Sequence, residues 1–219
     1  MTRVQVEPAP SLTLTQQSAV ARLTYAIESP GAVALLCGPR GVGKTLVLTH
    51  VAASRSRAGV AALCCTARDG VPPPADAPEG ILFVDDAHLV EAGELAAMVG
   101  TWRRRSPTGG LVLAGEGRLL TLVARDERLE QAVALRAVLG PFTLAESTAA
   151  LAPLLAAAAR EPDHQMALVR TIHEIAGGIP AEVARLASFV RDVAAAAPGG
   201  RLTPDDVEAV HRRLSPRAA

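Results

Sequence analysis

Residues 38–45 read Gly38-Pro39-Arg40-Gly41-Val42-Gly43-Lys44-Thr45. This stretch fits the phosphate-binding pattern G-x-x-x-x-G-K-[S/T] in full. An apolar run precedes it and a helix-forming stretch follows it, which is the strand–loop–helix context that the pattern requires. In such a loop the glycines let backbone N–H groups face the β-phosphate, and the following helix adds its N-terminal dipole. We therefore predict that residues 38–45 bind a nucleotide.

Lys44 is the only lysine of the chain, so every other residue among its 22 lysines and arginines is an arginine. A compact ammonium group on a flexible stem can reach the β- and γ-phosphates inside a closed loop, and the planar guanidinium group of arginine is no substitute. The composition departs from its arginine bias at the position where the chemistry demands lysine. The alternative, a chance glycine loop between a strand and a helix, leaves this placement of the lysine unexplained.

Length and composition bound the class of protein. The 219 residues allow one large domain, or a core domain with a smaller one, and a hydrophobic content of 49% suffices for a buried core. The net charge of zero argues against a global attraction to nucleic acid or to an acidic membrane. The start of the chain lacks a signal-peptide pattern, and there is no apolar run of about 18 residues that would span a membrane. We therefore expect a cytoplasmic protein.

The three cysteines Cys37, Cys64 and Cys65 all fall within predicted strands. An odd number of cysteines inside strands is typical of buried thiols in a reducing compartment. The alternative is a metal or redox role for the neighbouring Cys64 and Cys65, but no further ligand stands at a usable spacing.

The hydrophobic pattern predicts an α/β core followed by a helical region. Strands are expected at residues 32–37, 60–65, 81–85 and 111–114, with a short fifth strand near residues 139–144. The predicted fold class is therefore a P-loop parallel sheet in residues 1–145, of which 1–11 are expected to be loose, followed by a small all-helical lid in residues 146–219.

Helical periodicity marks the segments between these strands. We expect Thr15 to cap the first helix, residues 44–55 to form the second, and a helix after the fourth strand to reach about Arg136. The expected buried stripes are Leu95, Met98, Val99 and Trp102 in the core, and Met166, Val169, Ile172 and Ile175, then Val183, Leu186, Ala187 and Val190, in the lid. The proline-rich residues 66–80 leave no room for a crossover helix, so one sheet face should be thinly covered at that edge.

A second candidate site follows the apolar run at residues 81–84, which ends in Asp85 and Asp86. Ligands bind at the carboxyl ends of strands in open parallel sheets, so both carboxylates should lie beside the phosphate loop. We expect Asp85 and the Thr45 hydroxyl to bind Mg²⁺, and Asp86 to orient and polarise the attacking water. The alternative for Asp86 is a helix N-cap. For His88 we favour an exposed position over a catalytic one.

The phosphate loop, the strand end Asp85-Asp86-Ala87-His88 and the late turn Gly177-Gly178-Ile179-Pro180 together resemble AAA+ ATPases. The similarity is to the ExeA/GspA-type secretion ATPases and to the TniB-like and ORC-type subgroups, and it covers roughly residues 12–214. The resemblance implies ATP and Mg²⁺ as ligands and ATP hydrolysis as the reaction. It also implies work with a protein partner or with further copies of the chain.

Two acidic positions depart from the family's pattern. Asp86 stands where the family has a glutamate, and its side chain is shorter by about 1.5 Å of reach. Glu116 follows the fourth strand, where the family has the polar amide of the first sensor. An acid there repels the γ-phosphate unless it is protonated or turned away, and the chain contains no asparagine that could replace it.

The resemblance also implies roles for arginines. Arg136, which precedes Leu139-Gly140-Pro141, matches the family's candidate arginine finger, and a surface arginine on a helix is the alternative. Ala181 stands where the family has the second-sensor arginine. Arg185 lies one helical turn later on the same face and is the candidate substitute.

These residues are compatible with three functions. The first is an ATPase whose hydrolysis drives conformational change in a partner assembly. The second is a nucleotide-gated switch or scaffold with little turnover, which the departures at Asp86, Glu116 and Ala181 favour. The third is an ATP-dependent regulator of DNA transposition or replication, although the charge does not indicate nucleic acid. The basic cluster at residues 103–105 is explained by the favourable effect of cations at a helix C-terminus.

Overall fold

The computed structural model describes residues 12–69, 80–156, 161–196 and 202–214. Five parallel strands form one sheet in the order β2-β3-β4-β1-β5, which confirms the predicted fold class. The strands are β1 Val33–Cys37, β2 Ala62–Thr66, β3 Ile81–Asp85, β4 Leu111–Gly115 and β5 Val133–Val138. Because all strands run in the same direction, the segments that follow them lie together at the carboxyl ends of the strands.

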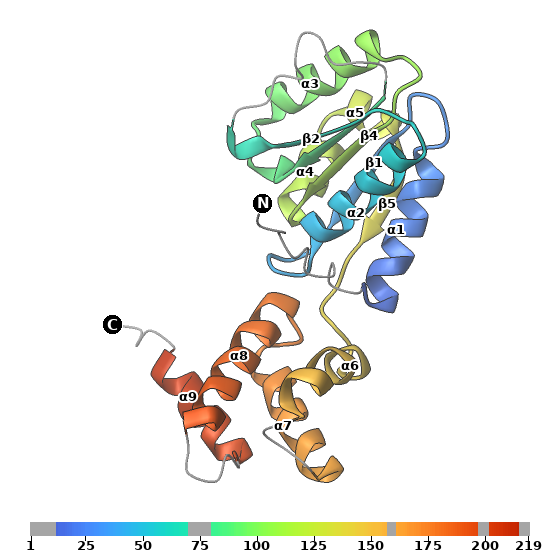
Figure 1. Cartoon of the computed structure of the whole chain (residues 1–219). Helices are drawn as coiled ribbons and strands as arrows, with labels where there is room; N and C mark the ends of the chain where they lie inside the picture. Colours follow the sequence, from blue (N-terminus) through green and yellow to red (C-terminus); the bar gives the residue numbers. More distant parts are fainter. Residues whose placement is uncertain (1–11, 70–79, 157–160, 197–201, 215–219) are drawn as a thin grey trace, which may run out of the picture.

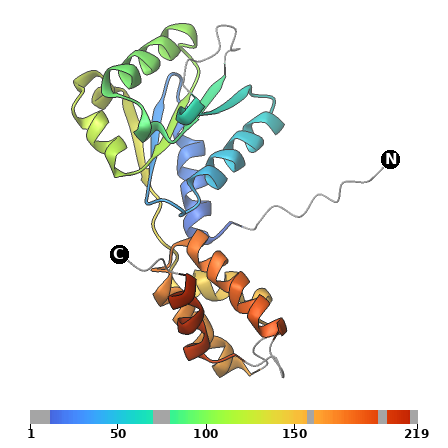
Figure 2. The ribbon, with the colours of Figure 1, turned by 90° about the vertical axis from the view of Figure 1, so that its left-hand side faces the viewer.

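Helices cover both faces of the sheet (Figure 1, Figure 2). On one face lie α1 Leu14–Ala26 and α2 Lys44–Arg57, and on the other lie α3 Ala92–Arg105, α4 Gly117–Ala124 and α5 Glu127–Ala132. Two short 3₁₀ helices, η1 Ala67–Asp69 and η2 Ala87–Leu89, follow β2 and β3. Successive strand residues point to opposite faces, so the same strands contribute to both cores.

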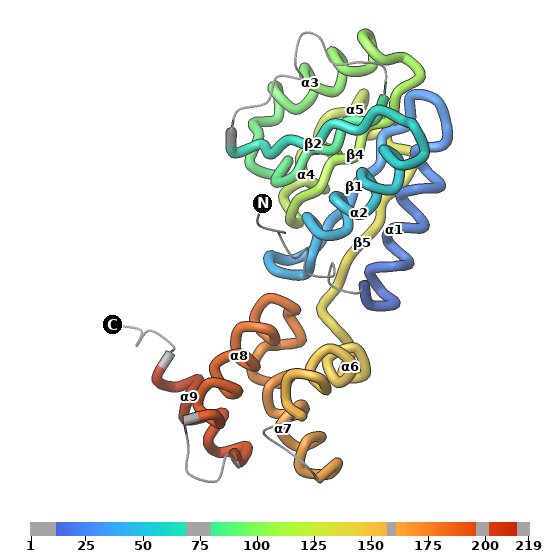
Figure 3. Tube along the Cα trace, viewed as in Figure 1, coloured from blue at the N-terminus to red at the C-terminus, as the bar shows by residue number. Residues whose placement is uncertain are grey.

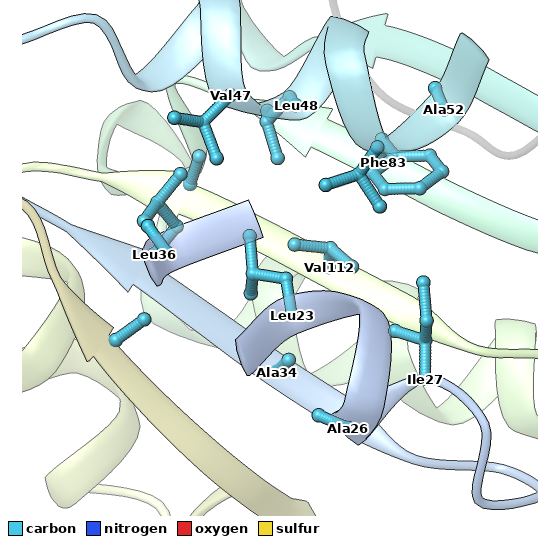
Figure 4. Close-up of a cluster of buried hydrophobic side chains, with 14 of the residues drawn as sticks. Leu23, Ala26, Ile27, Ala34, Leu36, Val47, Leu48, Ala52, Phe83 and Val112 are labelled. Carbon is cyan, nitrogen blue, oxygen red and sulfur yellow. The ribbon is translucent and has the colours of Figure 1, made fainter. Parts of the chain in front are cut away.

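Figure 4 shows the core between the sheet and the first two helices. Leu23 of α1 and Val47 of α2 pack here with Leu36, Phe83 and Val112 of three different strands, and all five side chains are fully buried. On the opposite face the predicted stripe of α3 is buried as expected, and it consists of Leu95, Met98, Val99 and Trp102. The loop between β1 and α2 therefore starts and ends on elements that are anchored in a packed core.

Four further helices form a separate core after the sheet. They are α6 Leu144–Leu155, α7 Pro162–Ile175, α8 Pro180–Ala196 and α9 Pro204–Leu214, and we refer to them as the lid. Figure 3 shows the chain leaving β5 and entering α6 through one connecting segment. The predicted stripe of α8 is buried, but Met166 of α7 is 39% exposed and Leu168 lies in the core instead.

The helix boundaries around β5 differ from the prediction. α5 ends at Ala132 and β5 follows directly, so the helix predicted to reach Arg136 and the strand predicted near residues 139–144 are both wrong. Alanine, leucine and arginine favour a helix, but pairing with β1 overrides this propensity at the sheet edge. The cap of α1 is Thr13 and not Thr15, because Thr13 forms a capping box with Gln16.

The edge strand β2 is only partly covered, as the proline-rich crossover predicted. Cys64 is exposed and Cys65 is half-buried, so the prediction of buried thiols holds for Cys37 and is wrong for Cys64. Burial and the neighbouring Cys64 raise the pKa of Cys65 to about 11, which keeps this thiol protonated at neutral pH. Residues 70–79 of the crossover lie outside the described ranges. Among the helices of those ranges, none is long and apolar enough to span a bilayer.

Candidate nucleotide-binding site

The phosphate loop joins β1 to α2, which begins at Lys44. Gly41 and Gly43 have φ angles of 82° and 97°, a region that glycine adopts without steric cost. Gly43 is the N-cap of α2, and no side chain caps the helix. The first N–H groups of α2 are therefore available to an anion, and the helix dipole favours a negative charge at this position.

Neighbouring elements enclose the loop so closely that a Cβ atom on its glycines would displace a neighbouring group. A Cβ atom on Gly38 would lie 2.2 Å from the carbonyl oxygen of Leu139. A Cβ atom on Gly41 would lie 2.9 Å from Ile179 Cγ2, and one on Gly43 would lie 2.6 Å from Gln16 Nε2. The loop is thus held among the start of α1, the segment after β5 and the start of the lid helix α8.

The side chain of Lys44 bends back into this loop. Lys44 is 8% exposed, and its Nζ donates hydrogen bonds to the carbonyl oxygens of Gly38 and Pro39 at 2.9 and 2.8 Å. These acceptors hold the ammonium group inside the loop, beside the uncapped N–H groups at the start of α2. An ammonium group in this place can bind the phosphates that those N–H groups attract.

The two predicted Mg²⁺ ligands lie in contact with each other. The Thr45 hydroxyl donates to Asp85 Oδ2 at 2.5 Å, and Asp85 Oδ1 accepts from the backbone N–H of Asp86 at 2.8 Å. Hydroxyl and carboxylate oxygens suit Mg²⁺, which usually keeps several waters and binds through one or two carboxylates and the substrate phosphates. Thr45 and Asp85 supply one oxygen of each of these two kinds, so they fit this sparse kind of site.

Asp86 has an unusual backbone conformation. Its φ angle is 54°, and it is the one non-glycine residue of the described ranges with a positive φ. Asp86 occupies the N-cap position of η2, but its side chain makes no capping hydrogen bond. The capping alternative therefore has no support. The carboxylate binds Arg68 instead, with Asp86 Oδ2 2.5 Å from Arg68 Nε.

Arg68, which the sequence interpretation missed, stands two residues after β2. Thr66, at the end of β2, pairs in register with Asp85. Arg68 therefore lies at the carboxyl ends of the strands, as both aspartates do. The hydrogen bond and the charge of Asp86 raise the pKa of Arg68, with smaller contributions from Asp85 and Glu116. Arg68 is thus a cation that interacts with three carboxylates, those of Asp86, Asp85 and Glu116. Its position at the end of a strand was the signal available in the sequence.

Glu116 and His88 lie next to each other at the ends of β4 and β3. His88 Nε2 is 3.7 Å from Glu116 Oε1, and the histidine side chain is only 11% exposed. The expectation of an exposed histidine is therefore wrong, because the 3₁₀ turn after β3 directs His88 against Gly115. Among the described residues, no partner binds His88 Nδ1. Glu116 remains half-exposed at the start of α4.

Arg136 lies on the edge strand β5 and not on a helix. Its guanidinium group binds Glu130 Oε1 of α5 at 2.6 Å and is 41% exposed. Its carbonyl oxygen accepts a hydrogen bond from Arg22 Nη2 of α1 at 2.9 Å. Its role as an arginine finger stays a prediction, and the element that carries the residue is an edge strand instead of the predicted helix.

The lid reaches the phosphate loop through Ala181. Its backbone N–H donates to the carbonyl oxygen of Gly41 at 3.1 Å, so the position that the resemblance assigns to the second-sensor arginine does lie at the loop. Arg185 binds Glu182 on its own helix at 2.5 Å, and it lines a small hollow with Phe189 and His211. Its role as a substitute sensor stays a prediction.

Similarities to solved structures identify the fold, whereas no model of a protein family and no curated protein matches the chain. The Thermotoga maritima RuvB Holliday junction branch migration motor is 21% identical, with a TM-score of 0.65 over 90% of this chain and 69% of that chain. The Aeropyrum pernix ORC1 protein in complex with DNA is 18% identical, with a TM-score of 0.63 over 96% and 68% of the two chains. Hsp104 in a closed state is 17% identical, with a TM-score of 0.61 over 96% and 43%. All three are AAA+ P-loop ATPases, so the chain has the AAA+ fold.

Proposed function

We propose that this chain binds ATP with Mg²⁺ at residues 38–45 and couples ATP binding and hydrolysis to a movement of its lid that acts on a partner assembly. The observation that carries the proposal is the placement of Lys44, the only lysine, inside the glycine loop beside the Thr45–Asp85 contact. Thr45 and Asp85 would hold Mg²⁺, which would neutralise developing charge on the phosphate oxygens. Asp86 would orient and polarise the attacking water.

A nucleotide-gated switch with little turnover is the second candidate, and a specific contact favours it. The carboxylate of Asp86 forms an ion pair with Arg68, which holds its Oδ2 on the side of β2. Glu116 adds another carboxylate at the carboxyl ends of the strands, and Ala181 supplies no cation beside the phosphate loop. Both candidates bind ATP, and they differ in the rate of phosphate release.

The test of the nucleotide site is a titration with a fluorescent ATP analogue and Mg²⁺. Lys44→Ala is expected to abolish saturable binding and to keep the far-UV circular dichroism and melting temperature of the wild type. Unchanged affinity in the folded variant would remove the site from consideration. Steady-state phosphate release then separates the candidates, since a switch shows binding without turnover. Stimulation by duplex DNA would instead favour a regulator that acts on DNA.

A further inference from the structure

Glu146, in the first turn of α6, binds the N-terminal ends of two helices at once. Its Oε2 accepts from the N–H of Thr143 at 2.9 Å in the capping box of α6. Its Oε1 accepts at 3.0 Å from the N–H of Thr15 in the first turn of α1, 131 residues away. Burial raises the pKa of Glu146, but hydrogen bonds from the N–H groups of Thr143 and Thr15 and from the side chains of Thr15 and Thr13 together lower this pKa to about 2. A carboxylate that is charged at neutral pH therefore joins the positive ends of both helices.

The start of α1, in turn, contacts the phosphate loop. Gln16 follows Thr15 and is only 3% exposed. Its Nε2 donates to the carbonyl oxygen of Val42 at 3.4 Å, and this nitrogen fills the space in which Gly43 would carry a Cβ atom. Its Oε1 accepts from the N–H of Thr13. The position of Gln16 against the loop therefore depends on the start of α1, which Glu146 holds.

The lid contacts the loop from its other side through the start of α8. The N–H of Ala181 donates to the carbonyl oxygen of Gly41, and Ile179 packs directly on this glycine. Within the lid, α8 packs against α6 in the shared hydrophobic core. The contacts thus form a closed circuit that runs from the loop to α1, through Glu146 to α6, and through α8 back to the loop.

We propose that Glu146 is a positioning residue that sets the orientation of the lid against the phosphate loop and thereby controls nucleotide affinity. This inference rests on the proposed nucleotide site. Without the bond from Glu146 to Thr15, the lid is joined to the core by the segment after β5 and by the contacts of Ile179 and Ala181 with Gly41, and α8 can move away from Gly41. The loop then loses support on both sides, and a bound nucleotide dissociates faster.

The test compares Glu146→Gln with a control variant, Glu174→Gln, which changes an exposed carboxylate of α7 in the same lid. Glu146→Gln is expected to raise the dissociation rate of the fluorescent ATP analogue about tenfold, the order expected for the loss of a charge-assisted hydrogen bond. KM for ATP should rise by a similar factor with little change in kcat. In the nucleotide-free protein, amide exchange at residues 41–45 should become faster. Glu174→Gln should leave all three quantities unchanged.

A second variant keeps the test decisive if Glu146→Gln does not fold. Thr15→Pro removes both the N–H and the hydroxyl with which Thr15 binds Glu146, and it keeps the carboxylate. Proline is tolerated in the first turn of a helix. This variant should reproduce the faster exchange and the faster dissociation. Wild-type exchange and dissociation in a folded variant would overturn the role of Glu146. If the wild type shows no saturable nucleotide binding, the proposed function fails, and the exchange measurement still tests the circuit.

Discussion

Asp85 and Asp86 are adjacent in sequence but have different partners. Asp85 lies within β3 and binds the Thr45 hydroxyl, on the side of the phosphate loop. Asp86 has left the strand with a positive φ angle, and it binds Arg68 on the side of β2. The two adjacent carboxylates therefore have different surroundings, and their separate roles in binding Mg²⁺ and in activating water stay a prediction.

Substitution of the two aspartates should separate these roles. Asp86→Ala is expected to keep the affinity for ATP and to lose about 10²-fold or more of the hydrolysis rate, the usual contribution of a general base. Asp85→Ala is expected to weaken the dependence of ATP binding on Mg²⁺, because it removes a metal ligand. Nucleotide titrations with and without Mg²⁺, followed by phosphate release, measure both effects. Equal behaviour of the two variants in both assays would contradict the division of roles.

Arg68 should restrain turnover in the isolated chain. Arg68→Ala is expected to raise phosphate release severalfold, because it removes the ion pair that holds the Asp86 carboxylate on the side of β2. ATP affinity should change little, since Arg68 makes no contact with the phosphate loop in the described structure. Arg191→Ala is the control, because Arg191 is also exposed and paired with an aspartate, Asp192, far from the loop. A lower rate in Arg68→Ala would show that Arg68 assists Asp86 instead.

At the scale of elements, the prediction from sequence succeeded where burial and pattern agree. β3 and α3 have continuous or periodic apolar residues, and both were located correctly. β5 was missed because an edge strand buries little, so its residues alternate weakly and its composition favours a helix. Only pairing with β1, about a hundred residues earlier, makes this segment a strand.

The same distinction applies to the site. The phosphate loop and the end of β3 are local motifs, and the residues within each of them could be recognised from spacing alone. Arg68, Gln16 and Glu146 act through contacts between distant segments, and no spacing in the sequence reveals those contacts. Glu146 did have a local signature, because Thr143 and Glu146 have the spacing of a capping box. Its second bond, to α1, exists only in the folded chain.

At the scale of the whole molecule, one side of the core is suited to an interface. Among the large apolar side chains of the described residues, the three most exposed are Leu14 and Tyr25, each 78%, and Val138, 66%. All three lie on α1 or β5, which pack against each other at the open edge of the sheet. Single exposed apolar side chains are ordinary, but three of them on two neighbouring elements make this the side that we propose for docking of a second copy. Arg136 lies on the same edge strand, so a second copy that docked here would meet it.

Arg136 is therefore predicted to act on the nucleotide of a neighbouring copy. Its pairing with the exposed Glu130 leaves it accessible from outside, and arginine fingers contribute ~10³–10⁵ in rate where they operate. Hydrolysis per subunit should rise with protein concentration. Mixing Arg136→Ala with Lys44→Ala should restore part of the activity, because the first variant keeps an intact phosphate loop and the second keeps an intact arginine. Turnover that is independent of concentration, with no rescue on mixing, would leave Arg136 as a partner of Glu130 alone, and the monomeric switch would then be the better description.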